Sequence, residues 1–108
     1  MESIRMADCI NQLNTDTAMS FCSTLERKLY RLQDREPLLI EKQHSIWQEK
    51  CDALLYIVNK INAFVDDATE YDWRIVRQDI RDYQDEYGGL DEMKVRFENT
   101  DNKLKYMY

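Results

Sequence analysis

Glycine and proline are almost missing from this chain, and this scarcity limits the folds that it can adopt. The 108 residues include two glycines, adjacent at Gly88 and Gly89, and one proline, Pro37. A sheet protein needs turn residues about every eight to twelve positions. The sequence therefore predicts an all-α fold of a few long helices. Pro37 suits the first turn of a helix, so we expect the chain to reverse just before it.

Apolar residues recur every three or four positions, the spacing that places them on one face of a helix. Four segments show this spacing: residues 3–33, 37–65, 69–87 and 90–107. Residues 51–65 are apolar around most of the helix, which predicts contact with more than one neighbour and a central position. We therefore predict one domain, residues 1–108, folded as an elongated antiparallel three-helix bundle. A full turn at Gly88-Gly89 would make it a four-helix bundle.

Short polar stretches predict where helices begin. Residues 14–17, with the sequence NTDT, have poor helix propensity, so we expect a break in the first segment. Thr15 or Asp16 would then cap the helix that follows. Thr69 precedes Asp72 by three residues, which resembles a capping box at the start of the third segment.

Acidic residues are concentrated in one part of the sequence. The whole chain has a net charge of −6, and residues 66–87 alone hold eight acids and three bases. Nucleic-acid binding requires clustered lysine and arginine, so this balance argues against a direct nucleic-acid ligand. The acidic segment is instead the strongest candidate for a functional surface.

Heptad spacing divides this acidic segment into two parts. A seam of apolar residues follows the three-four repeat of positions that face a neighbouring helix; its members are Trp73, Val76, Ile80, Tyr83 and Tyr87. Asp72, Asp79 and Glu86 occupy the flanking g positions, and every one is acidic. The aromatic residues are therefore expected to pack, and the acids to remain at the edge of the contact.

The predicted packing leaves these acids without counter-charges. In an up-down-up arrangement, the neighbouring segments offer only Arg5 and Lys60 as bases. We therefore expect four carboxylates to lack an internal counter-charge: Asp72, Asp79, Asp82 and Glu86. Two interpretations remain. Either the acids simply form the solvent-exposed side of an ordinary amphipathic helix, which keeps the bundle soluble, or they form a surface that docks a basic partner.

No constellation of catalytic or metal-binding residues stands out. His44 is the only histidine, whereas helical di-metal sites need the Glu-x-x-His motif twice. Cys9, Cys22 and Cys51 lie among apolar residues without disulfide or metal spacing, and we expect them to be small buried residues. The adjacent glycines cannot form a phosphate-binding loop. We therefore expect no enzyme activity, no cofactor and no metal.

The N-terminus has no basic stretch followed by an apolar run, so no secretory signal is expected. The most apolar window, residues 51–65, is short and contains Asp52 and Lys60, which argues against a membrane span. We expect a cytoplasmic or nuclear protein.

These patterns favour a non-catalytic helical protein–protein interaction module, such as a small complex subunit or an adaptor, with an acidic face on residues 69–87. The expected partner is a protein, with a basic surface if the acids take part in binding. A homodimer is a further expectation, because a chain of this size needs to cover wide apolar stripes. The alternative is a small acidic inhibitor of viral or phage type that occupies a basic site on a host protein.

Overall fold

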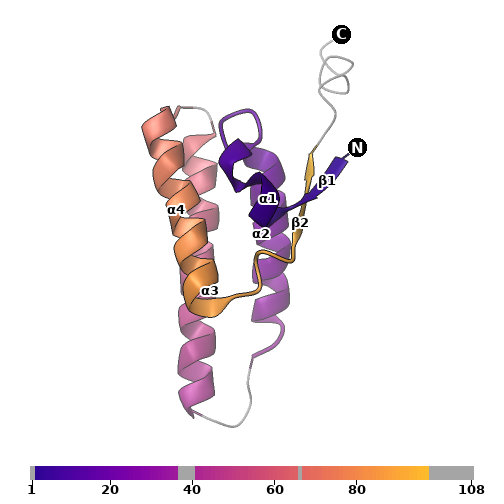
Figure 1. Ribbon diagram of the computed structural model, residues 1–108. Helices are drawn as coiled ribbons and strands as arrows, with labels where there is room; N and C mark the ends of the chain where they lie inside the picture. Colours follow the sequence, from indigo (N-terminus) through magenta and orange to yellow (C-terminus); the bar gives the residue numbers. More distant parts are fainter. Residues whose placement is uncertain (1, 37–40, 66, 98–108) are drawn as a thin grey trace.

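The computed structural model of the protein describes residues 2–36, 41–65 and 67–97. Its elements in chain order are β1 (Glu2–Arg5), α1 (Met6–Cys9), the 3-10 helix η1 (Ile10–Gln12), α2 (Ala18–Gln33), α3 (Glu41–Phe64), α4 (Glu70–Tyr87) and β2 (Lys94–Phe97). Helices dominate, which confirms the predicted helical fold class. The long helices run side by side along the molecule, which measures 53 × 27 × 23 Å (Figure 1).

Helix α3 packs against both α2 and α4. Its buried residues recur at helical spacing over more than two turns, as expected for a helix with two neighbours; they are Cys51, Leu54, Ile57, Val58 and Ile61. At the start of α3, the Trp47 indole donates a hydrogen bond to the Leu32 carbonyl of α2 (2.6 Å). The predicted double contact of this segment is therefore confirmed.

Local signals set both ends of α4. The Thr69 side chain accepts the backbone N–H of Asp72, and the Asp72 carboxylate accepts the backbone N–H of Thr69. This is the predicted capping box, and it satisfies backbone donors that a helix start leaves open. At the other end, Gly88 has φ 73°, a left-handed value that glycine adopts without steric cost. The helix ends there, as predicted.

Two predicted helical segments contain strands instead. Residues 2–5 form β1, although the helical spacing was expected to begin at residue 3, and residues 94–97 form β2 within the predicted fourth helix. The strands pair antiparallel, with Ile4 opposite Val95. Residues 90–93 of the predicted fourth helix form a turn, in which the Met93 N–H donates to the Leu90 carbonyl (3.0 Å). Residues 98–107, including Leu104 and Met107, lie outside the described residues.

The pairing of distant residues explains this correction. The sequence KVRF of β2 alternates, with Val95 buried and Lys94 and Arg96 exposed, and this period of two suits a half-buried strand. Four residues are too few to separate this pattern from a helical one. The choice depends on β1, at the opposite end of the described chain, which supplies the hydrogen-bonding partner.

The predicted caps before α2 are also wrong. Thr17, not Thr15 or Asp16, precedes the helix, and its side chain makes no capping hydrogen bond. The Asn14 amide oxygen instead accepts the backbone N–H groups of Asp16 (2.9 Å) and Thr17 (3.1 Å). An asparagine side chain can stabilise a turn in this way, which competes with capping. The predicted position of Pro37 in a first helical turn lies outside the described residues.

Candidate functional site

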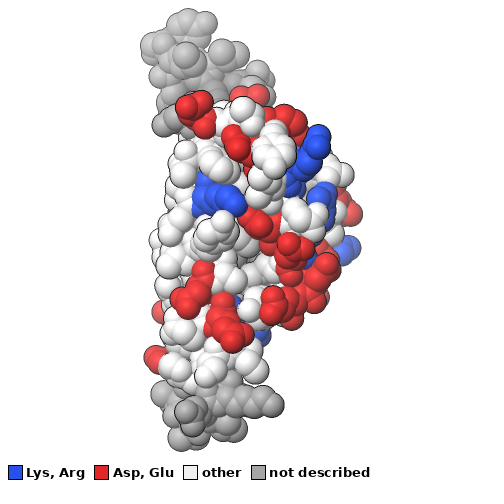
Figure 2. Space-filling view, turned by 90° about the vertical axis from the view of Figure 1, so that its left-hand side faces the viewer, with Lys and Arg blue, Asp and Glu red and all other residues white. Residues whose placement is uncertain are grey.

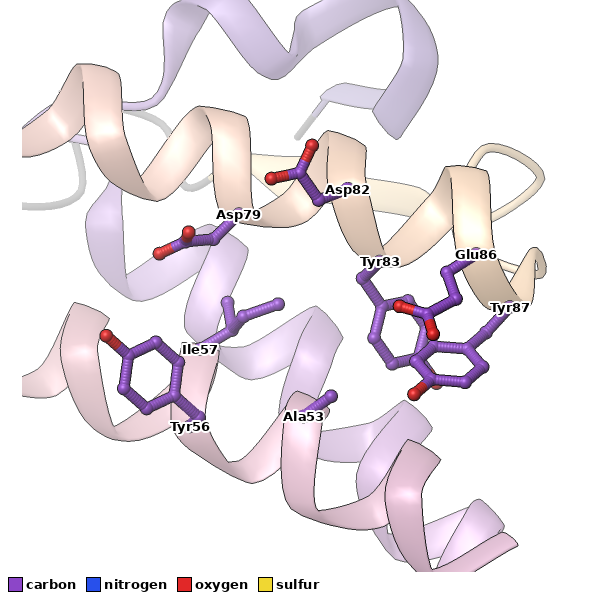
Figure 3. Close-up of a pocket in the computed structure, with 8 residues that line it drawn as sticks. All are labelled: Ala53, Tyr56, Ile57, Asp79, Asp82, Tyr83, Glu86 and Tyr87. Carbon is purple, nitrogen blue, oxygen red and sulfur yellow. The ribbon is translucent and has the colours of Figure 1, made fainter. Parts of the chain in front are cut away.

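An open groove lies between α3 and α4, with a volume of about 200 Å³. Its lining residues come from both helices: Ala53, Tyr56 and Ile57 of α3, and Asp79, Asp82, Tyr83, Glu86 and Tyr87 of α4 (Figure 3). Three of the four predicted acidic-face residues therefore meet three tyrosines. The groove combines carboxylate acceptors with aromatic rings.

Tyrosine rings form much of the apolar part of the groove. The rings of Tyr83 and Tyr87 lie 5.0 Å apart between centroids, and Figure 3 shows them together between the helices. Tyr83 is buried, whereas Tyr56 on the α3 side keeps 58% of its surface exposed. Burial raises the pKa of Tyr83 to about 12, and burial together with the Glu86 carboxylate raises the pKa of Tyr87. Both hydroxyls therefore remain protonated near neutral pH.

The carboxylates form a row along the α4 side of the groove. Asp79, Asp82 and Glu86 are spaced by three and four residues, so they follow one side of the helix. Figure 3 shows Glu86 directed over the tyrosine rings, while Asp82 lies on the outer rim. Asp82 accepts a hydrogen bond from the Gln78 amide (2.9 Å). Figure 2 shows acidic side chains gathered on the face of the molecule formed by these helices.

Lys60 of α3 occupies one end of this environment. Its amino group lies 3.2 Å from a carboxylate oxygen of Asp79 and donates a hydrogen bond to the Tyr56 hydroxyl (3.0 Å). The same nitrogen is 5.0 Å from the centroid of the Tyr56 ring. The Tyr56 hydrogen bond and the Asp79 carboxylate raise the pKa of Lys60, although partial burial opposes this effect. The prediction that Asp79 lacks an internal counter-charge is therefore wrong.

The fourth predicted acidic residue, Asp72, does not reach the groove. Its carboxylate accepts hydrogen bonds from the backbone N–H and the hydroxyl of Thr69, at 2.9 and 3.1 Å. This carboxylate stabilises the first turn of α4. The sequence placed Asp72 both in a capping box and at an acidic g position. In the structure its carboxylate forms the capping box.

The predicted aromatic seam forms part of the core. Trp73, Val76, Ile80 and Tyr83 are buried, and Tyr87 is half-buried. The Trp73 indole donates a hydrogen bond to the Thr15 hydroxyl (3.0 Å), and its ring meets the Phe64 ring edge-on at 5.9 Å. These residues pack α4 against the rest of the molecule, and only Tyr83 and Tyr87 also reach the groove.

The opposite side of α4 is covered by other parts of the chain. We call this side the closed flank; its polar residues are Glu70, Arg77, Arg81 and Gln84. Arg77 donates to the Leu13 carbonyl (2.6 and 3.0 Å) and to the Glu70 carboxylate (2.6 Å). Arg81 donates to Asn11 (2.5 Å), and Gln84 accepts the backbone N–H of Leu90 (2.6 Å). We call the side with Asp79, Asp82 and Glu86 the open flank.

Sequence reasoning missed the α3 side of the groove. Ile57 was expected only as part of an apolar seam, and Tyr56 and Ala53 were not predicted as site residues. Tyr56 precedes Lys60 by four residues, so both lie on one face of α3. That spacing was the signal available for an aromatic and a cation side by side.

In the ranges that the structure describes, the other reactive side chains do not form a second site. Cys9, Cys22 and Cys51 are buried and free, and burial raises the pKa of all three thiols, that of Cys22 to about 12. His44 lies 2.9 Å from the Glu36 carboxylate and beside the Trp47 ring. Among the described residues, no cluster of three metal-ligating side chains occurs. The groove therefore remains the candidate site, and its chemistry suits the binding of a cation.

Within the described ranges, none of the helices combines the length and the apolar character that crossing a membrane requires. Comparisons with protein-family models, with curated proteins and with solved structures found no significant match to this chain.

Proposed function

We propose that the protein is a non-catalytic helical interaction module that binds a basic protein partner in the α3–α4 groove. The observation that carries this proposal is the meeting of Asp79, Asp82 and Glu86 with tyrosine rings in an open groove. Carboxylates attract arginine and lysine electrostatically, and tyrosine faces attract the same cations through their π electrons. An acidic inhibitor that blocks a basic site would use the same surface.

Lys60 provides an internal example of this recognition. It places an ammonium group against both a groove carboxylate and a groove tyrosine, although only 21% of its side chain is exposed. The Asp82 and Glu86 carboxylates form no ion pair with another described residue. The part of the groove beyond Lys60 therefore offers the same two types of group to a cation from outside.

The spacing of the carboxylates suits a partner surface that carries a row of bases. Asp79 and Glu86 are seven residues apart, or about 10 Å along a helix axis at about 1.5 Å per residue. A partner helix with bases at positions i, i+4 and i+7 presents a row of the same length. A short helix of this kind therefore serves as a probe of the groove between α3 and α4, because amphipathic helices dock into grooves of other proteins.

A labelled helical peptide with arginines at i, i+4 and i+7 tests this proposal by fluorescence anisotropy. Asp82→Lys with Glu86→Lys should weaken binding by at least about tenfold, because each exposed ion pair contributes up to about 1 kcal/mol and reversal adds repulsion. Asp85→Lys is the control, since Asp85 is exposed on α4 outside the groove. Equal affinity for the wild type and the double variant, or an equal loss in the control, would contradict the proposal.

A further inference from the structure

The small sheet presents a basic outer face. In β1 and β2 the half-buried or buried residues Ile4, Val95 and Phe97 turn inward, and Phe97 meets the Phe21 ring of α2 edge-on at 5.8 Å. The alternate residues are exposed; they are Ser3, Arg5, Lys94 and Arg96. Since side chains alternate across a strand, these four share the outer face. Three of them are cations.

The arrangement of these cations is unfavourable within one molecule. Arg5 lies directly opposite Lys94 in the antiparallel register. Like charges at directly opposed positions destabilise a strand pair. In the described part of the chain, Arg5, Lys94 and Arg96 form no ion pair with any carboxylate. This face therefore carries a cost that an external acidic surface would relieve.

The basic face and the acidic groove lie on different sides of the molecule. The sheet packs beside α2, on the side away from α4, while the groove lies between α3 and α4 (Figure 1). The sheet cations of one copy therefore cannot reach the groove carboxylates of the same copy. In a pair of copies, the sheet of one copy can contact the groove of the other.

We infer that the basic partner of the groove is a second copy of this chain, which inserts the outer face of its β1–β2 sheet. This inference rests on the proposed function, because it identifies the partner of the same groove. Lys94 and Arg96 of the sheet would meet Asp82 and Glu86, the two open-flank carboxylates that form no ion pair with another described residue. Lys94 and Arg96 are two strand residues apart, or about 7 Å, and Asp82 and Glu86 are one helical turn apart, or about 6 Å.

Such a contact joins two different surfaces, so it is heterologous. Each pair of copies keeps one free groove and one free sheet face. The association therefore continues to larger species unless the geometry closes a ring. Because the contact joins exposed charges, it should weaken as salt shortens the Debye length from about 10 Å at about 0.1 M to about 3 Å at about 1 M.

Two neutralised variants test the inference by sedimentation velocity of the full chain. One carries Lys94→Gln with Arg96→Gln, and the other carries Asp82→Asn with Glu86→Gln. The wild type should exceed its monomer mass of 13.1 kDa as concentration rises at low salt, and each variant alone should remain monomeric. A mixture of the two variants retains one intact groove and one intact sheet face, so it should form a complex of two chains and nothing larger.

A wild type that stays monomeric at every concentration, or variants that associate as the wild type does, would overturn the inference. Circular dichroism of each variant checks that the substitutions leave the fold in place. The arginine-peptide titration decides the proposed function separately. A groove that binds the peptide in a protein that remains monomeric would retain the proposed function and remove the second copy as its partner.

Discussion

The two flanks of α4 differ in what covers them. On the closed flank, Arg77, Arg81 and Gln84 bond to residues 11–13 and to the turn after the helix. On the open flank, Asp79 meets Lys60, and Asp82 bonds only within its own helix among the described residues. Both flanks are polar and both border the same buried seam. The two flanks therefore differ in whether other parts of the chain cover their charges, and not in charge alone.

This comparison assigns separate roles to three stripes of one helix. The seam and the closed flank should contribute to the stability of the fold, and the open flank should contribute to binding. Substitutions in the three stripes should therefore separate the free energy of unfolding from affinity. The expected effects decrease from the seam to the closed flank and then to single exposed charges.

The largest effect is expected for Trp73→Ala in the seam. Trp73 is buried and contacts both Phe64 and Thr15, so its truncation leaves a cavity between α4, α3 and the N-terminal segment. We expect a loss of about 3–5 kcal/mol in the free energy of unfolding, measured by urea denaturation. Tyr71→Ala is the control, because Tyr71 is 67% exposed on the same helix. A comparable loss of unfolding free energy in both variants would contradict the prediction that the seam stabilises the fold more than the exposed surface does.

The next effect compares the two flanks directly. Arg77→Met keeps much of the side-chain volume but leaves the Leu13 carbonyl without its donor, and only 12% of the Arg77 side chain is exposed. We expect a loss of about 2 kcal/mol, since a hydrogen bond to a charged group contributes about 1.5–3 kcal/mol. Asp82→Ala on the open flank should change stability by less than about 0.5 kcal/mol.

Urea denaturation of both variants under the same conditions checks this prediction. If Asp82→Ala destabilises the protein as much as Arg77→Met does, then the open flank supports the fold. The acids of the groove would then no longer be free for a partner. If neither variant destabilises the protein, then the hydrogen bonds of Arg77 do not stabilise the fold, and the closed flank does not differ from the open flank in its contribution to stability.

The sequence predicted α4 well because its signals are local. The capping box joins Thr69 to Asp72, three residues apart, and Gly88 directly follows the last residue of the helix. Each signal therefore lies within a few residues of the helix end that it sets. The seam is also a local signal, because its residues are only three or four positions apart. Such features depend on backbone geometry that neighbouring residues determine together.

The parts that the sequence did not predict depend on distant contacts. Strand β2 exists because Val95 pairs with Ile4 across almost the whole described chain. The groove requires Tyr56 of α3 to face Asp79 of α4, and the register between two helices cannot be read from the spacing within either one. Arg77 shows the same limit, since its partner at Leu13 lies 64 positions away.

The smallest predicted effect concerns Glu70, the exposed end of the closed flank. The Arg77 hydrogen bond lowers the pKa of Glu70 below its ordinary value of 4.5 in the folded protein. In the pH range between these two values, the unfolded chain binds more protons than the folded one. The contribution of the pair is therefore fully present above pH 4.5 and is lost as the pH falls through the lowered value.

Glu70→Gln removes this charge and should make the protein slightly less stable than the wild type at pH 7. The difference should disappear near pH 2, where the wild-type carboxyl group is also neutral. Urea denaturation across this range measures it, with Asp85→Asn as a control on an exposed acid outside both the closed flank and the groove. If the Glu70 variant loses the same stability at every pH, then the side chain acts through packing, and Arg77 is held to the closed flank by the Leu13 carbonyl alone.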